Sequence, residues 1–237
     1  MPVVQKLINI ALAEFLGTAT MLFLVCTGCT LGIQGAVSSL HLSLCAGLSV
    51  MAAIQMFGYI SGAHINPVVS LAALMVDEIS YLETPVYIVS QILGCLTGCG
   101  LQKMVTPLQH ESQNPERGIC VNAPHETLTD WEACGVEIIL TTIMVFAVLA
   151  TWDKRNGNNM DSVALRIGFL VGVLNLAAGP FTGASMNPVR SFGPAVWNND
   201  FRSHWIYWIG PTLGSLIATI TYKYSFMRVQ LGVTDYK

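Results

Sequence analysis

The chain has 237 residues and a formal net charge of -3, and 53% of its residues are hydrophobic whereas only 11% are charged. Soluble domains carry about 25% charged residues, so this composition argues against a single water-soluble core. The negative charge argues against a nucleic-acid partner, which would require a basic face. The composition therefore predicts an integral membrane protein.

Stretches without Asp, Glu, Lys or Arg divide the chain into membrane spans. The first runs from 15 to 76, and shorter ones follow at 84–102, 138–152, 167–189 and 203–222. A spanning helix needs about 20 mostly apolar residues, so each shorter stretch fits one span and the first divides at a turn-like region, 32–39. The predicted helices cover about 8–31, 40–59, 85–105, 132–152, 163–179 and 204–224.

The distribution of basic residues predicts the orientation. Six spans place both chain ends on one side of the membrane, together with Lys6, Lys154 and Arg155. The positive-inside rule assigns that side to the cytoplasm and the loop 106–130 to the outside. No cleavable signal peptide is expected, because the first apolar stretch is long and lacks a cleavage-like site. We expect a multi-pass plasma-membrane protein with cytoplasmic termini.

The two halves of the chain resemble each other. Glu14 lies in AEFLGTATMLF and Glu137 in VEIILTTIMVF, while Asn66 lies in SGAHINPVVS and Asn187 in TGASMNPVRS, at nearly the same offset. Because each half holds three spans, the second half enters the membrane from the opposite side, as in the inverted repeats of transport proteins. This predicts one domain over 1–237, with repeats at about 7–105 and 131–225.

Each half also contains an Asn-Pro pair before a short apolar stretch. Asn is a favourable N-cap, and Pro suits the first helical position. The stretches 67–76 and 188–197 are too short to span a bilayer, so they predict re-entrant half-helices whose N-termini meet near the midplane. Two positive helix ends would repel cations, including hydronium, and the amides of Asn66 and Asn187 would donate to a passing oxygen.

The irregular backbone before each Asn-Pro pair is predicted to line a polar path, since lipid does not tolerate such backbone. Glu14 and Glu137 are expected to act as structural buttresses that accept hydrogen bonds from loop N–H groups. Arg190 is costly at membrane depth unless it lines an aqueous path, and the equivalent position in the first half is Val69. The expected acceptor carbonyls belong to Gly62, Ala63, His64, Gly183, Ala184 and Ser185.

These motifs resemble the aquaporin, or major intrinsic protein, family over nearly the whole chain. The resemblance is carried by AEFLGT, SGAHINPVV, EIILTT, TGASMNPVRSFGPAV and HWIYWIGP. It implies an all-α membrane protein with six transmembrane helices, two re-entrant half-helices and one pore per subunit of a homotetramer. The family usually has Asn-Pro-Ala twice, whereas both triplets here end in Val. They are Asn66, Pro67 and Val68, and Asn187, Pro188 and Val189.

The resemblance also implies a selectivity filter of Ala46, Asn175, Ala184 and Arg190. Water-selective members typically have Phe and His where Ala46 and Asn175 stand. The loss of two rings predicts a wider constriction that passes glycerol and urea beside water. The chain thus resembles insect glycerol-permeable channels derived from the water-channel branch (entomoglyceroporins). Ser191, which follows the filter arginine, is similar to the residue of the water-channel branch, whereas glycerol facilitators of the usual type carry Asp there.

Alternatives to this interpretation stay open at this point. Met51 or Phe57 can fill the space beside Ala46, which would leave a water-selective aquaporin, and a junctional or structural membrane protein with little transport can share the fold. No enzyme activity, cofactor or metal is expected, because the five histidines lack ligand spacing and the cysteines lie mostly within the spans. Mercurials are expected to be ineffective unless Cys45 is accessible.

Overall fold

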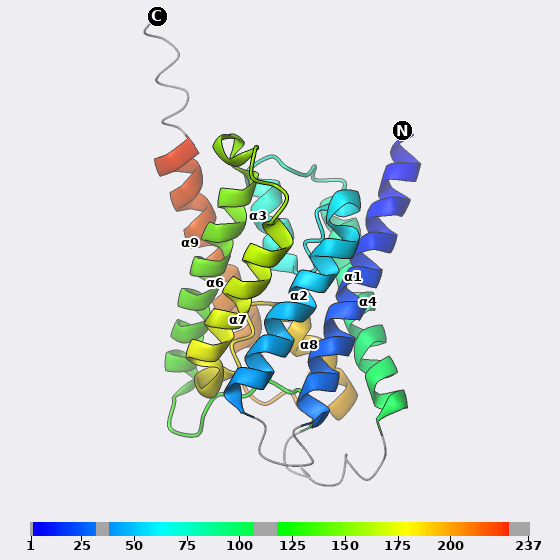
Figure 1. Ribbon diagram of the computed structural model, residues 1–237. Coiled ribbons are helices and arrows are strands. Elements are labelled where there is room, and N and C mark those ends of the chain that lie inside the picture. The colour runs from blue at the N-terminus through cyan, green and yellow to red at the C-terminus, as the bar shows by residue number, and fades with distance from the viewer. Residues whose placement is uncertain (1, 32–37, 107–117, 228–237) are drawn as a thin grey trace, which may run out of the picture.

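The chain folds into a bundle of helices that lie side by side, and successive long helices run in opposite directions (Figure 1). The computed structural model describes residues 2–31, 38–106 and 118–227. Within these ranges, five helices are long and apolar enough to cross a membrane. They are α1 (Val3–Leu31), α2 (Ser39–Ser61), α4 (Thr84–Val105), α6 (Asp130–Trp152) and α7 (Val163–Thr182).

The sixth predicted span is a shorter α-helix with an extension. Helix α9 (Ile206–Thr221) continues directly into the π-helical segment η3 (Tyr222–Met227). Helix α7 ends at Thr182 rather than at the predicted 179, because it tolerates Pro180 in its last turn and stops at Gly183, which has a left-handed φ of 79°. The predicted all-α fold with six spans is confirmed. Of the predicted turn-like region 32–39, residues 32–37 lie outside the described residues, Ser38 is the N-cap of α2 and Ser39 is its first residue.

Two short helices occupy the interior of the bundle. Helix α3 (Pro67–Met75) lies towards the side of the chain ends, and helix α8 (Pro188–Asn198) lies towards the opposite side (Figure 1). The N-caps are Asn66 and Asn187, whose side chains accept hydrogen bonds from Val68 N and Val189 N at 3.1 Å. The predicted half-helices are therefore present, and they enter from opposite sides as an inverted repeat requires.

Glycines allow the long helices to approach closely, in the pairs α1 with α4, α2 with α7, and α6 with α9. A Cβ atom on Gly94 would stand 2.5 Å from the carbonyl oxygen of Phe15, and one on Gly214 would stand 2.5 Å from that of Ile138. On Gly47, it would stand 2.4 Å from a carbonyl oxygen of α7. Small residues at helix contacts are typical of membrane bundles, where close backbone packing drives association.

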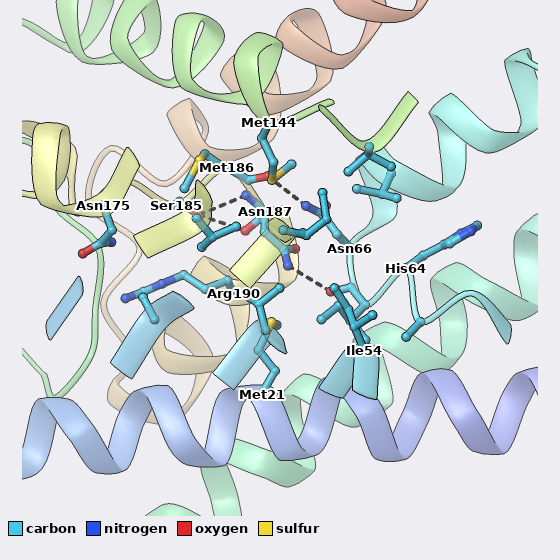
Figure 2. A pocket seen from close by; sticks show the side chains of 18 of the residues that line it. Met21, Ile54, His64, Asn66, Met144, Asn175, Ser185, Met186, Asn187 and Arg190 are labelled. Carbon is cyan, nitrogen blue, oxygen red and sulfur yellow. Dashed lines mark hydrogen bonds between the residues drawn. The ribbon is translucent and has the colours of Figure 1, made fainter. Parts of the chain in front are cut away.

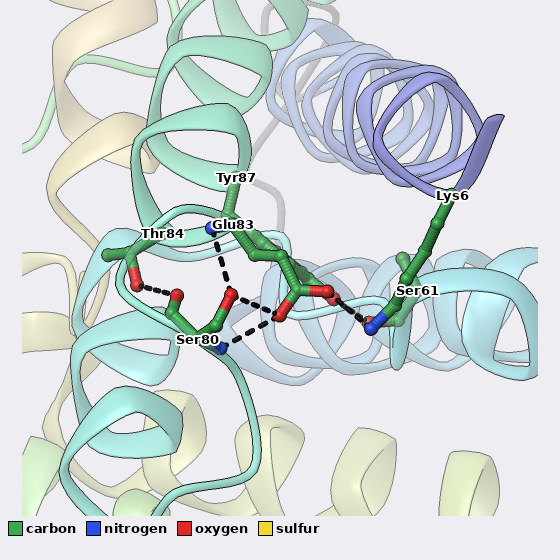
Figure 3. Close-up of polar contacts among 6 residues, drawn as sticks. All are labelled: Lys6, Ser61, Ser80, Glu83, Thr84 and Tyr87. Atoms are coloured by element: carbon green, nitrogen blue, oxygen red, sulfur yellow. Dashed lines mark hydrogen bonds and ion pairs between the residues drawn. The ribbon is translucent and has the colours of Figure 1, made fainter. Parts of the chain in front are cut away.

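The turn before α4 is tied to both α1 and the end of α2 (Figure 3). The Glu83 carboxylate pairs with the Lys6 ammonium and accepts hydrogen bonds from Ser80 N and Oγ at 2.8 and 2.9 Å. Burial alone would raise the pKa of Glu83, but the Lys6 and Ser80 donors outweigh it and lower that pKa below its ordinary value. The Tyr87 hydroxyl donates to the Ser61 carbonyl at 2.5 Å. These contacts fix the backbone that leads into the first Asn-Pro motif.

Both ends of the described chain lie on the same side of the bundle (Figure 1). The connection between α6 and α7, which includes the 3-10 helix η2 (Lys154–Asn156), also lies there. The C-terminal ends of α1 and α4 lie on the opposite side, and residues 107–117 of the predicted loop 106–130 fall outside the described residues.

Candidate functional site

A central cavity of about 110 Å³ runs between the two half-helices (Figure 2). Asn66 and Asn187 lie at its middle, with His64 towards one end and Asn175 and Arg190 towards the other. Each water needs roughly 15 Å³ of such volume, so the cavity holds on the order of seven. Much of the remaining wall is apolar, from Met21, Val50, Ile54, Met144, Val148, Ile167 and Val171.

A second cavity of about 330 Å³, here called the vestibule, adjoins the first and is lined by residues near the C-terminal end of α1 and the N-terminal end of α2. Both cavities are bounded by Val25, Ala46, Asn175 and Arg190, so they meet at these four residues. Three of the four predicted filter residues therefore lie at the junction, and the fourth, Ala184, lines the central cavity next to it. Val25, which the motif analysis did not identify, completes the boundary.

The two Asn side chains cross-link the halves of the chain. Asn66 Nδ2 donates to the Met186 carbonyl, and Asn187 Nδ2 donates to the Ile65 carbonyl, both at 2.9 Å. An amide group has two N–H donors, so each Asn keeps a second donor for a molecule in the cavity. The positive ends of α3 and α8 meet at the same place.

The loops before the two motifs have matching strained backbones. Gly62 and Gly183 have φ of 85° and 79°, and the next residues, Ala63 and Ala184, have φ of 45° and 43°. Ile65 and Met186 are also left-handed. Non-glycine residues in this region cost about 1–2 kcal/mol each, so the surroundings must hold them there. All six residues predicted to supply carbonyls line one of the two cavities.

Two fully buried glutamates hold these loops. Glu14 accepts hydrogen bonds from Ser61 Oγ, His64 N, Ile65 N and Gln91 Nε2 at 2.7–2.8 Å.

Glu137 accepts from Thr182 Oγ1, Ser185 N and Met186 N at 2.7–2.9 Å. The donors include two consecutive loop N–H groups in each half, as expected for a buttress. The carboxylates thereby fix the direction of the strained backbone, and nothing places them in the cavity wall.

The two valines of the Asn-Pro-Val triplets point into the protein core. Val68 and Val189 are 1% and 0% exposed and line neither cavity, and the Val68 carbonyl accepts a hydrogen bond from Ser215 Oγ at 2.8 Å. The adjoining Pro67 and Pro188 are buried at the first helical positions. The extra volume of valine relative to alanine therefore lies in the protein core and not in the cavity walls.

Neither Met51 nor Phe57 fills the space beside Ala46. Met51 lies against Gly168 of α7, Phe57 lies against Gly17 of α1, and neither residue lines a cavity in the described part of the chain. The small side chain of Ala46 thus leaves open space at the junction.

The amide of Asn175 is fixed at the junction by two hydrogen bonds. Ser43 Oγ donates to Asn175 Oδ1 at 3.1 Å, and Asn175 Nδ2 donates to the Gly183 carbonyl at 3.3 Å. A carbonyl oxygen has two lone pairs, so Gly183 can still accept from a molecule in the vestibule. The Asn side chain therefore contributes a positioned polar surface in place of a ring.

Arg190 is held by a segment that sequence reasoning overlooked. Its Nη1 donates to the Cys120 carbonyl at 2.9 Å and to Asn122 Oδ1, which also accepts from Ser191 Oγ at 2.9 Å. Asn122 is only 5% exposed, although it lies in a connection between two spans. The signal available in the sequence was the short apolar run at 119–121 between Gly118 and Asn122, within an otherwise polar loop.

Two thiols line the vestibule, and Cys45 does not. Cys29 and Cys120 contribute to its wall, whereas Cys45 packs against Gly28 and lies 3.5 Å from His41 Nε2. The sequence-based expectation named Cys45 alone as a target for mercurials, and Cys29 and Cys120 are further candidates because they line the vestibule. Mercury sensitivity itself stays a prediction. Cys120 was overlooked because it belongs to a connecting segment that folds back onto Arg190. Within the described residues, no group of three or more His, Cys, Asp or Glu side chains is arranged to hold a metal ion.

Comparisons with known proteins identify relatives in sequence and in structure. The family model described as Major intrinsic protein matches residues 3–222. Aquaporin-4 of Mus musculus is 41% identical over 220 residues, which cover 90% of this chain and 66% of that protein. Aquaporin-2 of Rattus norvegicus is 37% identical over 213 residues, covering 90% of this chain and 77% of that protein. The chain thus spans slightly less than two thirds of the length of the aquaporin-4 relative.

A solved structure shares the fold. The X-ray structure of the aquaglyceroporin from Plasmodium falciparum superimposes with a TM-score of 0.79 at 22% identity, covering 94% of this chain and 98% of that one. At this identity the likeness concerns the arrangement of the helices alone. The family model covers nearly the whole chain, and the chain contains paired half-helices and two buried glutamates. It therefore belongs to the major intrinsic protein family.

Proposed function

We propose that this protein is a passive transmembrane channel for water and small neutral solutes, including glycerol and urea, and that it excludes protons and ions. The observation that carries the proposal is the junction between the two cavities. Its four bounding residues, Val25, Ala46, Asn175 and Arg190, contribute no aromatic ring. Family membership supports a channel rather than an enzyme.

Ion and proton exclusion follows from charge at the middle and at the junction. The N-terminal ends of α3 and α8 each supply about half a positive charge, and Arg190 adds a full one at the junction. The free amide hydrogens of Asn66 and Asn187 engage the lone pairs of a central water, so that water cannot accept a proton along the file. Neutral molecules pay no comparable electrostatic penalty.

The junction presents both an apolar and a hydrogen-bonding surface, which suits the carbon and oxygen atoms of a polyol. Val25 and Ala46 present carbon, while Asn175 and Arg190 present hydrogen-bonding groups. A glycerol or urea molecule can place its polar atoms on the second pair and its remaining surface on the first. Water passes the same opening, since it needs less room and only the polar pair.

Osmotic swelling of proteoliposomes tests the proposal with added rings. We expect the wild type to pass water, glycerol and urea, and Ala46→Phe with Asn175→His to lose glycerol and urea flux while keeping water flux. Leu48→Phe adds a ring on the same helix at an exposed position and serves as the matched control. Water flux without solute flux in the wild type would make the protein a water-selective channel. Flux no greater than in empty liposomes would favour a junctional or structural role.

Assembly and location are part of the same proposal. We propose a homotetramer in the plasma membrane, with a pore in each subunit and cytoplasmic termini, related to the insect glycerol-permeable branch. Helix α2 is the least buried of the five long apolar helices in the described residues, so its outer face is available to lipid or a second subunit. Cross-linking in membranes that stops at four subunits, and protease cleavage of a tagged terminus only from the cytoplasmic side, are the expected results.

A further inference from the structure

We propose that Cys29 and Cys120 form a redox-active thiol pair in the vestibule, and that closing it into a reversible disulfide clamps the segment that holds Arg190. The two Sγ atoms lie 3.3 Å apart, although the residues are 91 positions apart in sequence. Cys29 lies in the last turns of α1, and Cys120 belongs to the segment that returns to the filter. Both cysteines are free thiols in the structure.

The pair is accessible, in contrast to the neighbouring thiols. Cys29 and Cys120 are partly exposed and line the vestibule. Cys26 and Cys99, whose Sγ atoms lie 3.8 Å apart, are each 2% exposed and line neither cavity. A small oxidant in the vestibule therefore meets the outer pair first.

A disulfide reagent such as oxidised glutathione supplies the chemistry. The thiolate of one cysteine attacks the reagent's disulfide, forming a mixed disulfide and releasing one glutathione thiol. The second cysteine then attacks the protein sulfur of that mixed disulfide and releases the second glutathione. Two protein thiols are oxidised to one disulfide while the reagent is reduced to two thiols, and the two protons pass to the released thiolates. The sulfur atoms need to approach from 3.3 Å to about 2.05 Å.

The clamp acts on Arg190 through the backbone of the same cysteine. The Cys120 carbonyl accepts a hydrogen bond from Arg190 Nη1 at 2.9 Å, and Asn122, two residues later, accepts from the same nitrogen. Cys120 has a φ of 66°, a left-handed conformation that its surroundings must maintain. Bonding its sulfur to α1 would restrict this segment and with it the position of the guanidinium.

The test uses the full chain in proteoliposomes, treated with oxidised glutathione and then with N-ethylmaleimide. Mass spectrometry of non-reduced peptides is expected to show a Cys29–Cys120 link in the wild type that dithiothreitol removes. Cys29→Ser should instead retain glutathione on Cys120, and Cys45→Ser, the matched control, should keep the link. A wild type in which both thiols are alkylated or singly glutathionylated without a link would overturn the pair, as would a link from Cys120 to Cys26.

Swelling assays test the coupling to Arg190 separately. Oxidation is expected to shift the glycerol-to-water permeability ratio of the wild type reversibly and to leave that of the Cys29→Ser, Cys120→Ser double variant, which can hold neither the link nor a glutathione adduct in the vestibule, unchanged. A fully linked protein with an unchanged ratio would refute the coupling. This outcome is distinguishable from failure of the proposed channel function, since a protein without that function shows no flux in either redox state.

Discussion

The two buried glutamates should respond unequally to the same substitution. Replacing a carboxylate by an amide keeps one acceptor oxygen and turns the other into an NH₂ donor. In Glu137→Gln, the retained oxygen can keep Thr182 and Ser185, but the new NH₂ then faces the Met186 N–H. One backbone donor and one side-chain NH₂ are left buried without acceptors.

In Glu14→Gln, a neighbour can compensate for part of this loss. Gln91 currently donates to Glu14 through Nε2, while its own Oε1 is buried without a hydrogen-bond partner. Rotating the Gln91 amide by half a turn would place that oxygen against the NH₂ group that the substitution introduces. Ile65 N would then lose its acceptor, and the Gln91 NH₂ would move to the place where Oε1 now lacks a partner. Ser70 Oγ, which now accepts from Gln91 Nε2, would donate to the rotated oxygen instead. The number of buried unsatisfied groups would thus rise by one.

The difference between the variants is therefore about one buried unsatisfied group. Each such group costs about 1–3 kcal/mol, so we expect Glu14→Gln to lose about 1–3 kcal/mol and Glu137→Gln about 2–6 kcal/mol. Thermal unfolding of the detergent-purified protein should rank the midpoints as wild type, Glu14→Gln and Glu137→Gln, in falling order. Adding Gln91→Leu should remove the advantage of Glu14→Gln. Equal midpoints for the two Gln variants, or the reverse order, would refute this reasoning.

Three further predictions concern the vestibule and the Lys6–Glu83 ion pair. Mercuric chloride should abolish most of the water flux of the wild type and of Cys45→Ser, but not that of the Cys29→Ser, Cys120→Ser double variant; a sensitive double variant would contradict the vestibule assignment. Asn122→Ala should cost about 1–3 kcal/mol in unfolding free energy and alter the glycerol-to-water ratio in swelling assays, because Arg190 and the Ser191 hydroxyl lose a shared acceptor. Glu83 has a lowered pKa, so its stabilisation is present above about pH 4.3 and is lost as the pH falls through the lowered value. Glu83→Gln should thus lower the unfolding midpoint at pH 7 by no more than the equivalent of about 1 kcal/mol, with the gap to wild type closing in acid; a constant gap would contradict the ion pair.

The membrane spans could be predicted because lipid penalises charge so strongly. The boundaries of α4 and α6 agree with the predicted spans to within two residues, since charged or polar residues end each charge-free stretch. Boundaries were less accurate where helix geometry decides the end, as at Pro180 of α7. The π-helical continuation of α9 has no signal in the hydrophobic pattern.

The candidate site was predictable to the extent that it repeats. The Asn-Pro pairs, the glutamates and the glycines each occur twice, so the sequence indicates both their partners and their symmetry. The hydrogen-bond partners of Arg190, in contrast, have no repeated counterpart in the other half of the chain. Cys120 and Asn122 lie about 70 positions away in a connection that would ordinarily be interpreted as solvent-exposed, and only the folded chain shows that it returns to Arg190.

The reciprocal contacts of the two Asn side chains also make assembly of the pore all-or-none. The Asn66 amide donates to a carbonyl of the second half, and the Asn187 amide donates to a carbonyl of the first. Each half therefore depends on the other for the acceptor that its Asn side chain uses. A polypeptide cut between α4 and α6 would be expected to regain transport only when both pieces meet. We therefore expect that neither half reaches its final structure at the Asn-Pro motif unless the other half is folded against it.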